Sequence, residues 1–155
     1  ETKLTGLDLS KAESLVSIST GAFAHTDITG TLMIPANVET IGMLAFSNSK
    51  LTGVDLSDAA SLTSIGDYAF RFTDLTGTLV IPANVKTIGN GAFQSTDITG
   101  TLVIPANVKT IGDGAFAYTK LTGLDLSDAA SLVSIGLRAF GYTDITGTLV
   151  IPANV

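Results

Sequence analysis

The side chains that could carry out catalysis or bind a metal are few and far apart in this chain of 155 residues. His25 is the only histidine, cysteine is absent, and the nearest downstream carboxylate is that of Asp27. A nucleophile or general base needs activating and orienting partners within hydrogen-bond reach. The sequence supplies no such pair for His25, which we interpret as a solvated turn residue. We therefore predict that the protein is not an enzyme and uses no cofactor.

Three aspartates, Asp8, Asp55 and Asp125, occupy the same position in three similar segments and could suggest a row of cation ligands. Calcium needs six to eight oxygen ligands around one point. The segments that carry these aspartates are separated by segments with an apolar residue at that position, so no two carboxylates are expected to be neighbours. We predict no metal site.

The composition excludes several classes of partner. The net charge is −6, whereas nucleic acids and anionic membrane surfaces attract basic proteins. Hydrophobic residues make up 45% of the chain but occur in twos and threes, so we expect no membrane insertion. Because cysteine is absent, neither a disulfide framework nor a thiolate metal site is available.

The dominant feature of the sequence is a repeat with a period of 23 or 24 residues. A period in the twenties predicts a solenoid, in which each repeat buries its apolar face by stacking on its neighbours. Because the pattern continues without a break, we predict one domain that spans residues 1–155. The repeats begin at Leu4, Ile28, Leu51, Leu75, Ile98, Leu121 and Ile145.

Two kinds of repeat alternate irregularly. Long units contain the sequence LTGLDLSDAASLVSIG or a close relative, and begin at Leu4, Leu51 and Leu121. Short units contain ITGTLVIPANVKTIG or a close relative, and begin at Ile28, Leu75, Ile98 and Ile145. A short unit gains one threonine before its first apolar pair and loses two residues after it. We expect these differences in length to lie in surface turns.

The apolar spacing within a unit predicts its elements. Apolar residues two apart, in the pattern L-x-[IL], predict a short strand. A turn at I-P-A-N or L-S-D-A-A-S follows, then a second short strand that ends at I-G, and then a tight helical turn that carries the pair A-F. We expect the apolar columns to form the core, including six of the seven phenylalanines: Phe23, Phe46, Phe70, Phe93, Phe116 and Phe140.

The string I-P-x-[NS]-V-x-[TS]-I-G-x-x-A-F-x-x-[CT]-x-[LI], present at 34–51, 81–98 and 104–121, resembles the repeat of the bacterial surface protein A-like (BspA-like) leucine-rich repeat family. The resemblance implies a right-handed solenoid, a place at the cell surface or outside the cell, adhesion or protein binding, and no catalytic residue. The family commonly has cysteine after A-F-x-x. We predict that a buried row of hydroxyls replaces it: Thr26, Ser49, Thr73, Thr96, Thr119 and Thr143.

The candidate binding positions are those where the repeat stops repeating, namely the two residues after I-G and the two after A-F. Relaxed constraint on stacking explains such variation equally well. Aromatic and arginine side chains, the types enriched at protein interfaces, nevertheless gather there. A second candidate surface is the outward column of the first strand, with Asp55, Val80, Val103 and Asp125. The residues of the first surface are Met43, Leu44, Tyr68, Arg71, Phe72, Tyr118, Leu137, Arg138 and Tyr142.

Two polar columns complete the pattern. A lysine precedes every long unit and an aspartate every short unit, so opposite charges should face each other at most steps and help to fix the register of the stack. A threonine follows the first residue of every unit, and short units carry T-G-T. Regular threonines on a flat face could bind ice, although threonine beside glycine in a turn often bonds to nearby backbone.

These observations predict a non-catalytic binding or structural module at or outside the cell surface. Three hypotheses remain open: adhesion or protein binding, a building segment of an extracellular filament or matrix, and ice binding. The sequence begins and ends inside a repeat, without a polar capping unit. We therefore expect self-association through the uncapped ends, beside a protein, cell-surface or matrix partner of the module. The segment carries no signal peptide, so the extracellular location rests on the resemblance.

Overall fold

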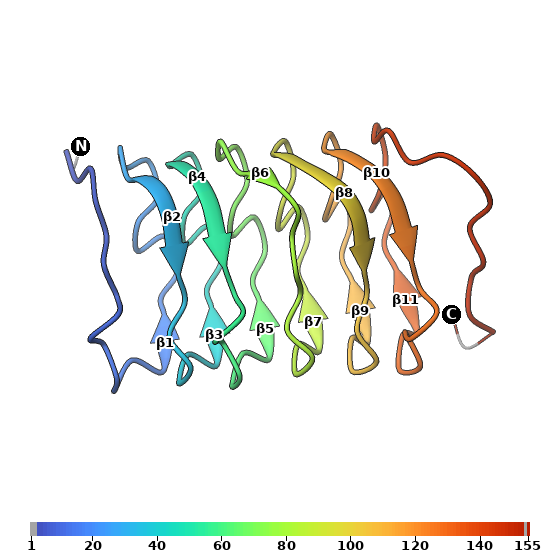
Figure 1. Ribbon diagram of the computed structural model, residues 1–155, viewed down its shortest axis with the longest axis horizontal. Coiled ribbons are helices and arrows are strands. Elements are labelled where there is room, and N and C mark those ends of the chain that lie inside the picture. Colours follow the sequence, from blue (N-terminus) through green and yellow to red (C-terminus); the bar gives the residue numbers. More distant parts are fainter. Residues whose placement is uncertain (1–2, 154) are drawn as a thin grey trace.

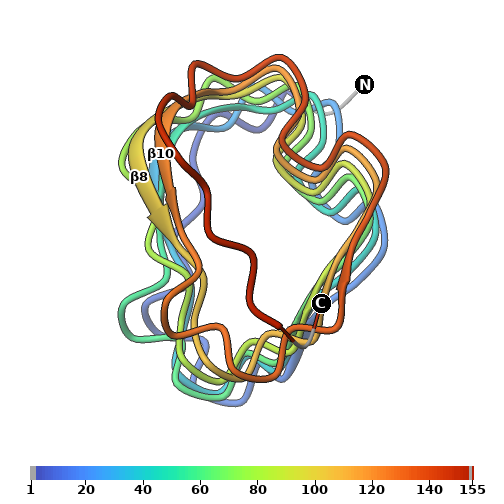
Figure 2. The ribbon, with the colours of Figure 1, turned by 90° about the vertical axis from the view of Figure 1, so that its right-hand side faces the viewer.

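The computed structural model describes residues 3–153 and 155 as a solenoid of stacked coils (Figure 1). Each repeat makes one coil, here called a rung, and rungs 1 to 7 begin at the seven repeat starts. The first and last rungs lie at opposite ends, and a view along the stack shows the coils superimposed (Figure 2). The prediction of a β-rich repeat solenoid is confirmed.

The second strands of rungs 1 to 6 form a continuous parallel sheet of six strands. Each strand is a serine or threonine followed by an isoleucine, and each pair lies directly against the equivalent pair of the next rung. A strand of two residues has no stability of its own, so pairing across rungs holds it in place. The strands are β1 (Ser17–Ile18), β3 (Thr40–Ile41), β5 (Ser64–Ile65), β7 (Thr87–Ile88), β9 (Thr110–Ile111) and β11 (Ser134–Ile135).

The first strands form two separate parallel sheets. One sheet pairs β2 with β4, and the other has the order β10-β8-β6. Strand pairing therefore joins a short unit to the short or long unit that follows it, and stops where a long unit precedes a short one, between β4 and β6. The strands are β2 (Thr29–Met33), β4 (Lys50–Asp55), β6 (Thr76–Gly77), β8 (Asp97–Val103) and β10 (Lys120–Asp125).

The extra threonine of a short unit explains where the register of these sheets shifts. The β2–β4 pairing shifts between Gly30 and Thr31. Thr31 lies against Gly53 of the next, long unit, where a Cβ atom would stand 2.6 Å from the threonine Oγ1. The same arrangement recurs at Gly123, which faces Thr101. A long unit thus accommodates the extra residue by placing glycine opposite it.

The A-F segment is not helical, so the expected helical turn is wrong. In rung 3 the N–H groups of Tyr68, Phe70 and Phe72 donate to carbonyls of rung 4 at 2.7–3.0 Å. The N–H groups of Ala69 and Arg71, which lie between them, donate to carbonyls three residues earlier in rung 3. A helix would direct every N–H along its own axis. Here every second N–H joins the neighbouring rung instead.

The core is a set of stacked columns. Phe46, Phe70, Phe93 and Phe116 are fully buried, and their rings stack with centroids 5.3–5.4 Å apart. The leucines at equivalent positions of the short units in rungs 2, 4 and 5, namely Leu32, Leu79 and Leu102, are also buried. The equivalent Val54 and Leu124 of long units are half-buried. Large apolar side chains of this kind each stabilise the fold by about 1.5–3 kcal/mol.

The end rungs have apolar side chains with a neighbouring rung on one side only. In rung 7, Leu149 and Ile151 are 41% and 46% exposed. In the two views the last segment crosses the end of the coil (Figures 1 and 2). The expected association of end units stays a prediction.

In the part of the chain that the structure describes, no helix has the length and apolar character needed to cross a membrane.

The glycine of I-G allows adjacent rungs to approach closely. A Cβ atom at Gly89 would stand 2.5 Å from the backbone nitrogen of Asp67 and 2.6 Å from the backbone carbon of Gly66. The same holds for Gly42, Gly66, Gly112 and Gly136, each against the preceding rung. Backbone cannot move aside without separating the rungs, so glycine is required at this column.

We predict that Gly89→Ala destabilises the protein by about 1–3 kcal/mol, the usual range for overpacking a tight interior. The midpoint of urea unfolding would measure the change. Gly6→Ala is the matched control, because a Cβ atom at Gly6 would have no neighbour within 4 Å. Equal midpoints for the two variants would contradict the close approach.

The predicted row of buried hydroxyls is confirmed at Thr26, Ser49, Thr73, Thr96 and Thr119, whereas Thr143 is half-buried. One of the buried hydroxyls lacks a hydrogen bond. Thr73, Thr96 and Thr119 are at most 4% exposed. Each Oγ1 donates to the carbonyl of the phenylalanine three residues earlier, at 2.8–2.9 Å. Ser49 is equally buried, but its hydroxyl has no hydrogen-bond partner.

Ser49→Thr should therefore stabilise the protein by about 1 kcal/mol, because the threonine rotamer of the other rungs would supply the missing hydrogen bond. The reverse change, Thr96→Ser, should lower stability. Thermal unfolding of both variants tests this pair. A lower melting temperature for Ser49→Thr would show that rung 2 has no room for the methyl group.

Candidate functional site

The candidate residues around the A-F pair occupy one edge of the solenoid, here called the A-F strip. It comprises residues 43–44, 67–68, 71–72, 94–95, 117–118, 137–138 and 141–142. Two backbone positions in each of rungs 1 to 6 are left-handed: the residue before A-F and the second residue after it. They are Gly21, Leu44, Tyr68, Gly91, Gly114 and Arg138 at the first position, and His25, Asn48, Phe72, Ser95, Tyr118 and Tyr142 at the second.

This backbone conformation explains how the strip presents its side chains. The left-handed residues of rungs 1 to 5 turn their N–H groups toward the next rung, as Leu44 does to the carbonyl of Asp67 at 2.8 Å. Glycine adopts such angles freely, whereas other residues lose about 1 kcal/mol or more. Six of the nine candidate residues occupy these positions with φ between 52° and 59°. The bonds between rungs offset this cost, and the large side chains project from the edge.

One cluster in the strip forms within rung 3. The guanidinium of Arg71 lies over two aromatic rings, with its Cζ 4.3 Å from the ring centroid of Phe72 and 5.2 Å from that of Tyr68. Phe72 is 46% exposed, whereas Tyr68 and Arg71 are half-buried. These cation–π contacts fix the arginine side chain against the solenoid.

A second cluster joins rungs 5 and 6. The rings of Tyr118 and Tyr142 stack with centroids 4.5 Å apart, and they are 53% and 64% exposed. They border a shallow depression of about 250 Å³ whose lining includes Asp113, Leu137 and Arg138. The lining also includes Tyr68 of rung 3, so residues of both clusters meet there. Of the remaining candidates, Met43 is exposed and Leu44 is half-buried.

Sequence reasoning missed a ladder of polar side chains beneath the strip. Asp67 Oδ1 accepts the N–H of Asn90 at 2.7 Å, and Asn90 Oδ1 accepts the N–H of Asp113 at 2.8 Å. Asp113 Oδ1 then accepts the N–H of Leu137 at 2.6 Å. These positions vary in sequence, but Asp, Asn and Asp in three consecutive rungs share a carbonyl-type oxygen at the same distance from the backbone. That shared acceptor is the signal that could have revealed the ladder.

The second candidate surface combines an apolar groove with structural aspartates. Val80 and Val103 are 69% and 46% exposed, and both line a groove of about 500 Å³. Asp55 and Asp125 lie in the outward column but cap turns: their Oδ1 atoms accept the N–H groups of Ser57 and Ser127 at 2.9 and 2.8 Å. This surface therefore offers valines for contact, while its carboxylates hold the long-unit turns.

The turn hydrogen bonds determine how these carboxylates titrate. The backbone N–H of Ser57, and then its hydroxyl, lower the pKa of Asp55 below its ordinary value of 3.8, and Ser127 does the same for Asp125. A depressed folded-state pKa stabilises the fold at pH values above the unfolded pKa, and this contribution is lost as pH falls through the folded pKa.

We predict that carboxyl chemical shifts followed by NMR give Asp55 and Asp125 pKa values below 3.8. In Asp55→Asn the amide oxygen can still accept the Ser57 N–H, so stability should change little at neutral pH, whereas Asp55→Ala should lower it. Titration of both carboxyls at or above the ordinary value would contradict the turn geometry.

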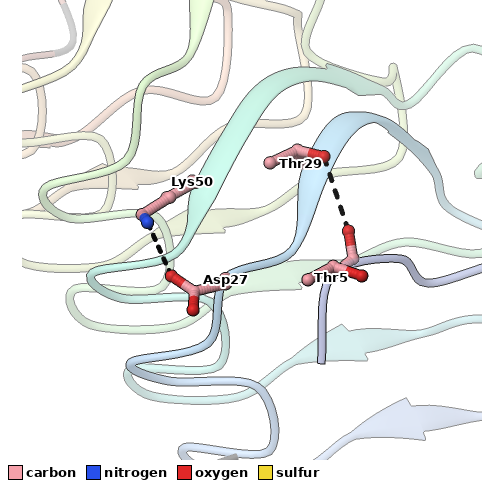
Figure 3. A network of polar contacts seen from close by, with 4 residues as sticks. All are labelled: Thr5, Asp27, Thr29 and Lys50. Carbon is pink, nitrogen blue, oxygen red and sulfur yellow. Dashed lines mark hydrogen bonds and ion pairs between the residues drawn. The ribbon is translucent and has the colours of Figure 1, made fainter. Parts of the chain in front are cut away.

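Among the described residues the charged column forms ion pairs at two of its steps, one of which is shown in Figure 3. This is fewer than the sequence predicts, and a role in fixing the register stays a prediction. Lys50 Nζ lies 2.7 Å from Asp27 Oδ1, and Lys120 Nζ lies 3.0 Å from Asp97 Oδ1. In both pairs the lysine that precedes a long unit bonds the aspartate that precedes the short unit before it. Asp27, more than any other group, raises the pKa of Lys50. Both pairs are exposed and screened by solvent, so each contributes little to stability.

The threonine rows are exposed, but two of their hydroxyls are occupied. Thr29 Oγ1 donates to the carbonyl of Thr5 at 3.4 Å (Figure 3), and Thr76 Oγ1 donates to the carbonyl of Thr52 at 3.3 Å. Both bonds cross from a long unit to a short one, where strand pairing stops.

His25 is exposed in its turn. Within residues 3–153 and 155, no cluster of three or more acidic or histidine side chains could hold a metal ion.

Stacked parallel rungs with one strongly patterned core and one variable edge define a solenoid repeat protein. The model of the BspA type leucine rich repeat region matches residues 1–122 and 40–155. The chain therefore belongs to the BspA-type leucine-rich repeat family, as the resemblance of its motifs indicated.

Two solved structures are similar to this chain. A leucine-rich repeat protein of T. pallidum (TpLRR) has 21% sequence identity and a TM-score of 0.49, over 78% of this chain and 66% of that one. A leucine-rich repeat protein from Bacteroides ovatus ATCC 8483 has 21% identity and a TM-score of 0.40, over 90% of this chain and 47% of that one. The chain thus spans about two thirds and about half of their lengths. The search of curated proteins gives no match.

Proposed function

We propose that this chain is a protein-binding repeat module that acts at the cell surface or outside the cell, and that the A-F strip is its recognition surface. The observation that carries the proposal is the set of large side chains at left-handed backbone positions. Three of them, Phe72, Tyr118 and Tyr142, are aromatic and 46–64% exposed. Glycine would adopt this backbone conformation without strain, and rungs 1, 4 and 5 have it at the other left-handed position, before A-F.

The chemistry of the strip suits a protein partner. Exposed tyrosine, phenylalanine and arginine side chains supply contact area together with polar groups, and they are the types that dominate binding energy at interfaces. The depression between the two clusters is shallow, and a broad partner could cover it together with its aromatic border. Membership of a leucine-rich repeat family supports binding, and the surface location rests on the family resemblance.

The two alternative functions make different demands on the structure. Ice binding needs a regular flat array of free hydroxyls, whereas Thr29 and Thr76 turn theirs to backbone carbonyls where the first-strand wall is interrupted. Assembly into a filament would use the end rungs, and light scattering over a range of protein concentrations separates it from binding by a module that stays small. Binding through the strip remains our proposal.

We expect the triple variant Phe72→Ala, Tyr118→Ala and Tyr142→Ala to lose binding to the surface or protein that the parent chain adheres to. Truncation of one central aromatic residue at an interface costs about 2 kcal/mol or more in affinity. The melting temperature should fall little, because the three rings are largely exposed. Adhesion measured by surface plasmon resonance, beside thermal unfolding, tests both expectations.

Matched controls keep this experiment decisive. Val16→Ala with Val133→Ala removes exposed apolar side chains outside the strip, and should leave binding unchanged. Val80→Ala with Val103→Ala tests the second surface. Unchanged binding in the triple variant, together with loss in the Val80 and Val103 variant, would move the site to the first-strand groove.

A further inference from the structure

The cluster in rung 3 holds an arginine whose hydrogen-bonding capacity is unused. The Nε of Arg71 is buried and has no hydrogen-bond partner. Among the described residues no carboxylate or carbonyl bonds its Nη atoms either, and its contacts are the two aromatic rings. A guanidinium carries five N–H donors in a planar fork. Only Nε of this guanidinium is both buried and unpaired, so its two Nη groups are open to an acceptor from outside the solenoid.

The two aromatic residues beside Arg71 hold its guanidinium in place. Tyr68 lies three residues before Arg71 and Phe72 directly after it, and both adopt left-handed backbone conformations, with φ of 57° and 55°. Aromatic packing restricts the side chain, so less conformational freedom is lost when it binds. A planar guanidinium matches the two oxygens of a carboxylate.

We propose that Arg71 is an oxyanion-binding position that takes a carboxylate of a protein partner, from an aspartate or glutamate side chain or a C-terminus. Only the identity of the partner as a protein rests on the proposed function. The net charge of −6 opposes an acidic ligand at long range, but salt screens charges beyond about 8 Å under physiological conditions. The carboxylate of Asp67, four residues earlier in the sequence, accepts hydrogen bonds from the N–H and the side-chain amide of Asn90.

Arg138 provides the internal comparison. It lies in the same strip three rungs further on, is exposed, and has no aromatic ring stacked on its guanidinium. An exposed arginine without such contacts attracts anions weakly and without saturation. If Arg71 binds anions more tightly than Arg138, the difference is therefore due to the aromatic cluster and not to charge alone.

The experiment follows arginine Nε–H signals of the whole chain by ¹⁵N NMR during titration with sodium acetate, sodium phosphate or sodium chloride at constant ionic strength. The buried Nε–H of Arg71 should exchange slowly and give a visible signal. We expect acetate to shift this signal saturably and to leave Arg138 unsaturated. Arg71→Lys, which keeps the charge but not the fork, should weaken acetate binding about tenfold, as should Tyr68→Leu. Arg138→Lys should not weaken it.

Several outcomes would overturn the proposal. Equal shifts with chloride would show general ionic attraction, and saturation only with phosphate would assign the site to phosphate. A linear, unsaturated response at both arginines would leave no site at Arg71. The probes are free anions, so the result is independent of the triple alanine test: loss of partner binding there without an acetate site would retain the proposed function and reject this inference.

Discussion

The whole structure depends on hydrogen bonds between adjacent rungs. A rung has strands of only two to seven residues, and its A-F segment sends every second N–H to the next rung. Side chains extend the same connection: Asn107 Nδ2 donates to the carbonyl of Ala83 in the preceding rung at 2.9 Å. Asn37 and Asn84 make the equivalent bonds. A single repeat could satisfy little of its own backbone, so the fold exists only as a stack.

This constraint decides which positions are fixed and which are free. Gly89 and its column must be glycine because backbone of the preceding rung lies where a Cβ atom would be. Phe93 must fill the interior between two other rings. The left-handed positions beside A-F fix the backbone but hold different side chains from rung to rung, some of which contact the next rung: Tyr68 lies where a Cβ atom at Gly91 would be, and Tyr118 stacks on Tyr142. Recognition can therefore vary at the strip while the spacing of the rungs stays constant.

The sequence alone was enough to predict the solenoid, the inward columns and most of the buried hydroxyl row. These features follow from spacing, which the repeat displays several times over. The sequence was misleading for the A-F segment, because a short pattern containing Ala and Phe suits a helix as well as a left-handed turn. The turn-capping role of Asp55 and the polar ladder from Asp67 to Asp113 were also missed, since both depend on where a backbone N–H points. The strip was located from its variability, but the stacking of Tyr118 on Tyr142 and the placement of Arg71 needed coordinates.

The sheets of first strands are interrupted where a long unit precedes a short one, and this interruption affects how the stack bends. The opposite wall, from β1 to β11, is continuous, so it can act as an inextensible backing. The interrupted wall consists of panels, one of rungs 2 and 3 and one of rungs 4 to 6, joined by fewer backbone bonds. Bending of the stack should open the seam between β4 and β6 first. The order of long and short units along the chain therefore determines where the stack is stiff and where it can bend.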